Sequence, residues 1–440
     1  MNRPSVLLLA ADPYQLRACE LHNINPVLLC DSGAYDSGRV RLPQGGTLIR
    51  VDDVTNPEDC LGALHREGLG DLRFEAVLTT WEFSVVTAAV LGRVLGCRSI
   101  DPATALHFRD KSLQKGRLQS AGLPVTRAVV IPDIYDVSGV PLEFERAVLK
   151  PIAGGGTKST TKVSGREDLE SVSRNCREEK STSRTFLLEE YVDGDEWMAE
   201  GVVFDGEVLF FGMGAYTQPC LDAINGQIPI SLRRLDPVHD ADAYESAEPV
   251  VRGAIAALGL RDSVFHMELF RERETGRIVF SECAARRGGA LTEEQVLAKF
   301  NVDLGEASLL CALGRRPQLD VKINPNVVGC VGLYGPAGTI VGYPTPDEVL
   351  AQPNVAYTQM YVPPGATLNS EFSASADMLG AVLLATETVE EFDTRVVQLR
   401  DWFDERLAVA VPGLTSGQRW AWQRDHWPER DYRYWLYDGE

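Results

Sequence analysis

The chain has 440 residues, of which 44% are hydrophobic and 24% charged, and its formal net charge at pH 7 is −20. This length is too great for one compact core and predicts about three packed lobes. The composition is that of an ordinary globular protein, and the acidic excess argues against a nucleic-acid partner, whose phosphates need a basic surface.

The chain carries no sign of a membrane segment or an exported form. No stretch approaches the roughly 18 apolar residues that a membrane span needs, and the opening MNRPSVLLLAADPY reads as a first β-strand rather than a signal peptide. The nine cysteines have no regular spacing and no C-x-x-C pair, so we expect them to be reduced and mostly buried. We therefore expect a cytoplasmic protein without a membrane partner.

The first 105 residues predict a small α/β layer with a mostly parallel sheet. Apolar runs at 6–10, 26–30 and 76–80 indicate strands, and a helical pattern follows at 83–95. Trp81-Glu82 follows the last of these strands, at the end where such sheets place ligands. The plain start of a helix is an equally good interpretation of this dipeptide.

Residues 106–192 carry two lysines in defined local settings. Asp110 is suited to cap a helix, which puts Lys111 in the first turn, where a cation is unfavourable for the helix dipole. Lys150 ends a short apolar strand and is followed by three glycines at 154–156. Consecutive glycines let backbone amides surround an anion. Taken alone, such a loop is more often a plain turn.

The segment Val264–Arg286 predicts two strands joined by a tight turn. If the turn centres on Thr275, Glu268 lies opposite Glu282 on the same face of the hairpin. Alternation places further residues on this face or at its end: His266, Phe280, Ala284 and Arg286. Facing carboxylates repel, and a divalent cation between them removes the conflict. The alternative is an exposed hairpin with solvated acids.

The segments from residue 200 to 262 and beyond residue 315 predict further strands, a helix, an irregular stretch and an aromatic-rich tail. A hairpin is expected at 200–212 with Asp205-Gly206 at its turn, followed by GAYTQPCLDAINGQIPIS, which is too rich in Gly, Pro and Asn to predict regular structure. We assign this loop to substrate recognition, with a connector as the alternative. Short strands and a helix at 389–407 follow. The last segment holds four of the seven tryptophans and predicts a tail clamped on its own chain, or a dimer contact.

In order and spacing, these motifs resemble the ATP-grasp carboxylate–amine ligases, over about 108–315. HMEL and SECAARRGG are most similar to the bacterial L-amino-acid ligases that make dipeptides. The resemblance implies a multi-lobed α/β and α+β protein with an ATP-grasp fold. Its predicted parts are an N-terminal Rossmann-like α/β lobe (1–105), a small lobe over the nucleotide (106–192), a central catalytic lobe (193–315) and a C-terminal α+β lobe (316–440).

The resemblance also implies roles for individual residues. Glu268 and Glu282 match the metal-binding acids, while Arg286 and Lys150 match residues that act on the transferred phosphoryl group. Residues implied to bind ATP are Lys111, Lys150, Gly154, Gly155, Gly156, Glu189, Glu190, Val192 and Glu196. Candidate substrate contacts are His266, Tyr216, Asp222, Gly288 and Gly289. The implied cofactor is Mg²⁺, with Mn²⁺ as an alternative, and the implied reaction is ADP-forming amide synthesis through an acyl phosphate.

One departure and two rival functions accompany this interpretation. Many relatives carry Asn two residues after the second acid as a further metal ligand, and here that position is Ala284. The enzymatic rival is a biotin-carboxylase-like ligase that uses bicarbonate; the other is a non-catalytic nucleotide-binding regulatory protein. The expected partners are a small-molecule acid and a small-molecule amine. The sequence leaves their identities open. It also leaves open the pathway, the number of metal ions and the choice between a monomer and a homodimer.

Overall fold

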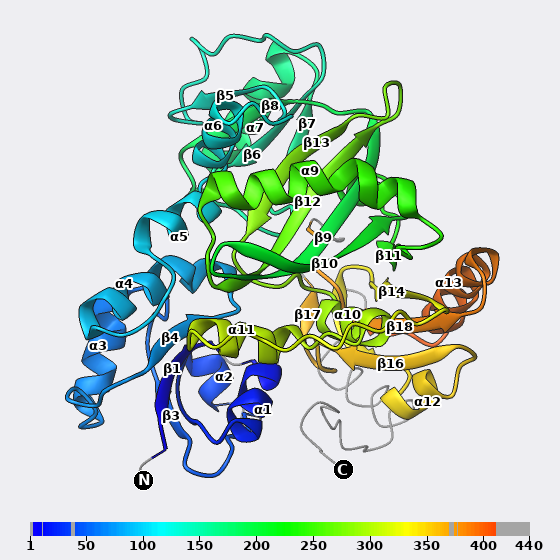
Figure 1. Ribbon diagram of the computed structural model, residues 1–440. Coiled ribbons are helices and arrows are strands. Elements are labelled where there is room, and N and C mark those ends of the chain that lie inside the picture. The colour runs from blue at the N-terminus through cyan, green and yellow to red at the C-terminus, as the bar shows by residue number, and fades with distance from the viewer. Residues whose placement is uncertain (1–2, 11, 37–39, 369–373, 376, 411–440) are drawn as a thin grey trace.

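The first part of the chain forms a parallel sheet, as the apolar runs predict, and its strand order is β3-β2-β1-β4. Strand β3 was not among the predicted strands. The computed structural model describes residues 3–10, 12–36, 40–368, 374–375 and 377–410. The elements of this N-terminal lobe, at the lower left of Figure 1, are β1 (Ser5–Leu9), α1 (Pro13–Leu21), β2 (Asn25–Cys30), α2 (Ser32–Asp36), β3 (Thr47–Arg50), α3 (Pro57–Arg66), β4 (Ala76–Thr79), the 3-10 helix η1 (Glu82–Ser84) and α4 (Val85–Leu95).

A small lobe follows at the top of Figure 1, built on an antiparallel sheet in the order β5-β8-β6-β7. Its elements, with the two helices that lead into it, are α5 (Pro102–Arg109), α6 (Lys111–Ser120), β5 (Ala128–Ile131), β6 (Ala147–Pro151), β7 (Thr161–Val163), α7 (Arg166–Glu178) and β8 (Phe186–Glu190). The first half of the polar run at 173–185 continues α7, because Leu169, Ser173 and Cys176 recur at helical spacing and are buried.

The largest sheet has eight strands in the order β13-β12-β9-β10-β11-β14-β18-β16, and its neighbours are antiparallel. The strands are β9 (Gly194–Phe204), β10 (Glu207–Tyr216), β11 (Ser231–Arg234), β12 (Ser263–Glu272), β13 (Ile278–Ala284), β14 (Val327–Leu333), β16 (Val355–Met360) and β18 (Gly380–Thr386). Because β11 pairs with β14, strands from beyond residue 315 continue the central sheet. The division into lobes at 315 stays a prediction, and it cuts through one hydrogen-bonded layer.

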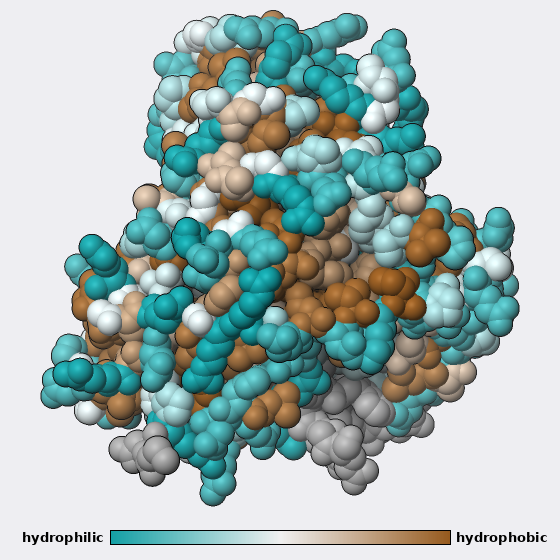
Figure 2. Space-filling view, viewed as in Figure 1, coloured by the Kyte–Doolittle hydropathy of each residue, from teal (hydrophilic) through white to brown (hydrophobic). Residues whose placement is uncertain are grey.

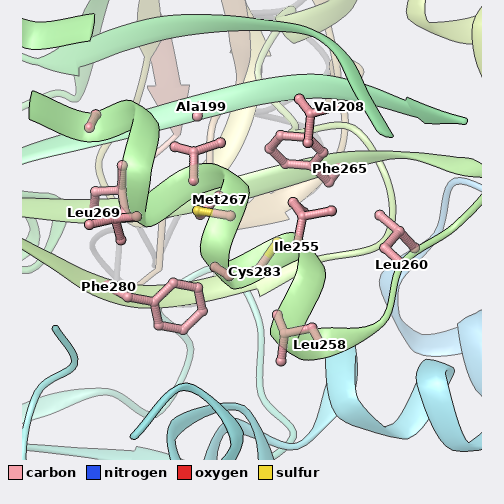
Figure 3. Close-up of a cluster of buried hydrophobic side chains, with 14 of the residues drawn as sticks. Ala199, Val208, Ile255, Leu258, Leu260, Phe265, Met267, Leu269, Phe280 and Cys283 are labelled. Carbon is pink, nitrogen blue, oxygen red and sulfur yellow. The ribbon is translucent and has the colours of Figure 1, made fainter. Parts of the chain in front are cut away.

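Helix α9 (Ala241–Leu258) covers one face of this sheet (Figures 1 and 3). Figure 3 shows Ile255 and Leu258 from the helix gathered with Ala199, Phe265 and Met267 from β9 and β12, all of them buried. Helices α10 (Thr292–Phe300) and α11 (Leu304–Ala312) bury their apolar residues against the opposite face. Since side chains alternate along a strand, the residues of β9 that point away from α9 are free to form a site.

The loop assigned to substrate recognition is more regular than its composition predicts. Strand β10 runs on to Tyr216, and α8 (Cys220–Asn225) follows, so the prediction of irregular structure is wrong there. Helix α8 forms because Cys220, Ala223 and Ile224 bury one side of it. The hairpin turn at Asp205-Gly206 is confirmed.

The remaining elements are β15 (Gly338–Gly342), α12 (Pro346–Leu350), β17 (Thr367–Leu368), α13 (Val389–Asp404) and β19 (Ala408–Ala410). All nine cysteines are free thiols and all but Cys97 are buried, as expected. None of the helices in the described part of the chain is both long and apolar enough to cross a bilayer. The tryptophan-rich tail at 411–440 lies outside the described residues.

Candidate active site

The paired acids lie where the hairpin pattern predicts. Glu268 of β12 and Glu282 of β13 are direct partners in the antiparallel ladder. A β-bulge follows at once, because the next pair is Leu269 with Phe280 and Ser281 has no partner. The bulge turns Phe280 into the α9 core, where it is fully buried (Figure 3), so the expectation that it shares the face of the acids is wrong.

A third carboxylate joins this pair. Glu196 on β9 is buried and accepts a hydrogen bond from the Cys220 amide at 2.7 Å. Burial, together with the neighbouring Glu268 carboxylate, raises the pKa of Glu196 to about 8. Hard carboxylate oxygens held close together against their repulsion fit a magnesium ion. Glu268 and Glu282 would hold it with phosphate and water oxygens, because no described group of three or more acids, histidines or cysteines has metal-binding geometry by itself.

The two predicted lysines reach the same carboxylate from different elements. The Lys111 Nζ lies 3.1 Å from Glu282, and the Lys150 Nζ lies 3.6 Å from it. Burial disfavours the charged carboxylate, but the two lysines outweigh it and lower the pKa of Glu282 to about 2. Lys111 stands in the first turn of α6, where Asp110 accepts bonds from the amides of Ser112 and Leu113. The cap predicted from the sequence therefore fixes the lysine's backbone.

A buried ion cluster lies behind Lys150. Glu189 on β8 is 3.0 Å from Lys150 and 3.1 Å from Lys115, and all three side chains are almost inaccessible. Burial lowers the pKa of Lys115 to about 8 despite its pairing with Glu189. Lys115 was not among the predicted site residues, although its spacing of four from Lys111 puts both on one face of α6.

The segment Tyr191-Val192, which follows β8, lines a cavity together with α8. Val192 and Glu190 belong to this lining, and Glu190 pairs with Arg127 at 2.7 Å. Asp222 of α8 is ion-paired with Lys162 and accepts a bond from the Tyr191 hydroxyl at 3.2 Å. Asp222 thus lies at the cavity matched to the nucleotide and does not line the second cavity described below.

The glycine loop is held by a residue that follows it by more than 200 positions in the chain. The amide of Ser375 donates to the Gly156 carbonyl at 3.1 Å and to the Thr157 hydroxyl at 2.8 Å. Gly156 has φ +62°, a backbone conformation for which glycine is best suited. Lys158, two residues further on, is exposed.

Arg286 is fixed by the N-terminal lobe. Its Nε lies 2.7 Å from Glu82, which also accepts a bond from Arg109 at 2.5 Å. Burial works against ionisation of Glu82, yet the two arginines hold its pKa below the ordinary value. Glu82 begins the turn after β4, so the strand end that the sequence left open does reach the site.

His266 is held by a carboxylate that the sequence reading missed. Glu200 on β9 is fully buried, 2.5 Å from the His266 Nδ1, and accepts a bond from the Gly288 amide at 3.0 Å. Burial alone would lower the pKa of His266, but Glu200 and Glu268 raise it to about 10. A Cβ at Gly288 would come within 2.6 Å of the Glu200 carboxylate, so a larger residue there would force this carboxylate to shift.

Two adjoining cavities collect all of the candidate residues. The first holds the residues matched to ATP and metal, together with Tyr216 and Asp222. The second, of about 460 Å³, holds Arg286, His266, Gly288 and Gly289. Residues that line both cavities mark the junction between them: Lys111, Gly154, Gly155, Gly156, Tyr216, Glu268, Glu282 and Ser375. A group transferred from the first cavity to the second would pass this junction.

The chain is similar in sequence and in fold to L-amino acid ligases. The chain is 27% identical over 336 residues to the L-arginine-specific L-amino acid ligase of Bacillus subtilis, a match that covers 74% of this chain and 79% of that protein. No family model matches the chain.

Solved structures share the fold. The L-amino acid ligase of Bacillus licheniformis superposes with a TM-score of 0.75 at 17% identity, covering 93% of this chain and all of that one. The biotin carboxylase domain of Hydrogenobacter thermophilus 2-oxoglutarate carboxylase, in complex with MgADP, ADP and bicarbonate, gives a TM-score of 0.66 at 16% identity and covers 92% of this chain and 90% of that one.

Proposed function

The chain belongs to the ATP-grasp superfamily, and from this premise we propose that it is an ATP-dependent ligase that joins an amino acid to an amine. The main support for this proposal is the junction of the two cavities. There Lys111 and Lys150 meet the facing acids Glu268 and Glu282, and Arg286 lines the same cavity as these acids. This is the arrangement that phosphoryl transfer requires, because it depends on positioning and charge rather than on a covalent nucleophile.

Different residues of the chain would bind the phosphates of ATP, the magnesium ion and the transferred phosphoryl group. Lys111 and Lys150 would bind the phosphates of ATP, and the glycine loop would cover them. Magnesium held by Glu268 and Glu282 would supply positive charge to the phosphoryl oxygens. Arg286 would hold the transferred phosphoryl group with a rigid fork of donors.

The proposed reaction has two steps. An oxygen of the substrate carboxylate attacks the γ-phosphorus, the bond to the β-phosphate oxygen breaks, and ADP leaves with that electron pair. The nitrogen of a neutral amine then attacks the acyl carbon, the carbon–oxygen bond to phosphate breaks, and the nitrogen gives up a proton. Exclusion of water by the glycine loop would protect the acyl phosphate between the steps.

A bicarbonate ligase of the same fold is the weaker candidate. Bicarbonate is small and polar, whereas the second cavity has a volume of about 460 Å³ and many apolar lining residues. This supports a larger substrate with an organic side chain.

The test is incubation with ATP, Mg²⁺ and pairs of amino acids. We expect phosphate release that depends on both amino acids, and a dipeptide detected by mass spectrometry. Phosphate release that responds to bicarbonate alone would favour the rival ligase. ATP binding without phosphate release under any condition would mean that the chain is not a ligase.

The Glu282→Gln variant tests the metal assignment. We expect turnover to fall by a factor of about 100 or more, because one of the two acids that orient magnesium is lost. Stability should fall by about 1–3 kcal/mol, since Lys111 and Lys150 both lose a charged partner. Steady-state rates and thermal melts measure the two effects.

Glu272→Gln is the matched control, because Glu272 stands on the same hairpin and pairs with Arg277 at 2.7 Å, away from both cavities. It should keep wild-type turnover. Equal rates in the two variants would remove Glu282 from the metal site.

A further inference from the structure

The second cavity has an apolar wall, and we propose that the acid activated by this chain carries an uncharged, apolar side chain. This inference rests on the proposed function and narrows its substrate class. The wall consists of buried side chains from β9, β11, β14 and the segments beside them: Met198, Ile230, Leu232, Cys330 and Met378. Gly332, Ala290 and Tyr361 complete it.

The apolar wall is the part of one packed hydrophobic core that faces the second cavity. Its five buried residues belong to one hydrophobic cluster, against which Ala290 and Tyr361 pack from the side. A wall made from core residues is rigid, because each side chain is held by neighbours on its other sides. A substrate side chain that lies against it removes further apolar surface from water, and this favours binding in proportion to the area covered.

The wall begins next to the reaction centre. Met198 is the direct partner of Glu268 in the β9–β12 ladder and stands between Glu196 and Glu200 on the same face of β9. A substrate carboxylate placed at the junction, between Glu268 and Arg286, would therefore lie one strand away from Met198. The side chain of the same substrate molecule would then extend along the wall. The molecule that occupies the apolar part of the cavity is therefore the activated acid rather than the amine.

Apart from the facing acids Glu268 and Glu282, the acidic and arginine side chains that line this cavity already have partners of opposite charge. Glu82 is paired with Arg286 and Arg109, and Arg287 is paired with Asp12 at 2.7 Å. No lining residue on the apolar wall is acidic or basic among those the structure describes. A guanidinium or carboxylate side chain would lose its water there without gaining an opposite charge, which is costly.

One more acid, Glu294, acts by its charge on the wall residue Cys330, but it is occupied elsewhere. Glu294 of α10 accepts a hydrogen bond from the Tyr14 hydroxyl and does not line the cavity. The proposed preference therefore differs from that of the arginine-specific relative. Leucine, methionine and phenylalanine are side chains of the expected kind.

Trapping with hydroxylamine tests this inference directly. Hydroxylamine captures an acyl phosphate as a hydroxamate, so the activated acid is identified without knowledge of the amine. With ATP, Mg²⁺ and one amino acid at a time, we expect kcat/KM for leucine, methionine or phenylalanine to exceed that for arginine and glutamate by at least about tenfold.

A pair of variants tests the wall itself. Met378 and Met360 are equally buried, at 8% and 7% exposure, but only Met378 lines the cavity; Met360 packs in a separate core cluster. Met378→Ala should lower the ratio of kcat/KM for leucine over alanine by about fivefold or more, because contact with the longer side chain is lost. Met360→Ala should lower the Tm to a similar extent and leave this ratio within about twofold.

The outcomes separate the inference from the function on which it rests. A preference for arginine or glutamate would overturn the inference and leave the ligase proposal standing. An equal change of the leucine-to-alanine ratio in both methionine variants would overturn the wall as the determinant. No hydroxamate from any amino acid would overturn both proposals.

Discussion

Arg286 shows how much the role of one side chain depends on a distant partner. It lies just beyond the end of β13, and its orientation comes from Glu82, about 200 residues earlier in the chain. Glu82 in turn is shared with Arg109. Arg109 thus holds Glu82, and Glu82 holds the Arg286 guanidinium at the edge of the second cavity.

The variant Arg286→Lys should lower kcat by about 100-fold or more, on the scale of losing one oxyanion-hole donor. Lysine keeps the positive charge but lacks the planar fork that binds two oxygens at once. The Kd for ATP should stay within a few-fold of wild type. Measuring kcat and Kd on one preparation checks this, and a fast but less stable variant would make Arg286 a structural residue.

Lys150 and Lys158 offer a second comparison at the residue scale. Lys150 is buried between Glu189 and Glu282, whereas Lys158 is exposed in the loop. Lys150→Ala should weaken the binding of MgADP much more than Lys158→Ala does. Calorimetry with ADP and Mg²⁺ measures both, and equal losses would mean that burial on β6 does not give Lys150 the larger role in phosphate binding.

At the scale of elements, the central sheet is tied together where β11 meets β14. Lys299 of α10 is fully buried and lies 2.7 Å from Asp236, which follows β11. The same ammonium donates to the carbonyls of Asn324 and Asn326, just before β14. One lysine therefore connects a helix to both strands at the point where the fourth lobe was predicted to begin.

This connection predicts a pH-dependent contribution to stability. Burial alone would raise the pKa of Asp236, but Lys299 and the amides of Val238 and His239 lower it to about 2, from 3.8. The carboxylate is thus favoured in the folded state, so its contribution is present above about pH 3.8 and is lost as the pH falls through 2. A shift of this size corresponds to about 2 kcal/mol.

The variant Asp236→Asn should therefore be less stable than wild type by about 2 kcal/mol at pH 7, and this difference should shrink below pH 3. Urea unfolding at several pH values measures it. Asp205→Asn is the control, since Asp205 pairs with Arg261 at the exposed surface and should cost little. A constant difference across the pH range would contradict the assigned pairing.

For the whole molecule, charge is distributed unevenly. The net charge is −20, yet Lys111, Lys115, Lys150 and Arg286 converge around the junction of the cavities. Figure 2 shows a largely hydrophilic outer surface on one side, with apolar side chains gathered toward the middle between the small lobe and the lower lobes. An anionic nucleotide would bind by local charge, against the field of the protein as a whole.

Two distant segments also meet at the first cavity, where the amide of Ser375 holds the glycine loop through Gly156 and Thr157. The isosteric variant Thr157→Val removes one acceptor of this contact. We expect the KM for ATP to rise about 3- to 10-fold, in line with the loss of one hydrogen bond, with a nearly unchanged Tm.

Initial-rate kinetics and thermal melts check this expectation. Thr161→Val is the control, because Thr161 lies on β7 beside Leu149 and lines neither cavity. An unchanged KM for Thr157→Val would show that the contact between the lobes does not assist nucleotide binding.

The features that the sequence determined by itself are local ones. The cap at Asp110, the turn around Thr275 and the facing acids Glu268 and Glu282 follow from side-chain spacing and turn chemistry over a few residues. Such patterns depend on strand and helix periods, which neighbouring residues set. The resemblance to the ATP-grasp ligases links these separate motifs to one fold.

Tertiary structure alone decided the features that join distant segments. The bulge at Ser281 that turns Phe280 into the core, the pairing of β11 with β14, and the pair Glu82–Arg286 each need two surfaces that the chain brings together only on folding. The apolar wall is the clearest case, because its residues come from six stretches of the chain and none is unusual in its own surroundings. Local patterns specify elements, whereas packing between elements specifies which side chains share a cavity.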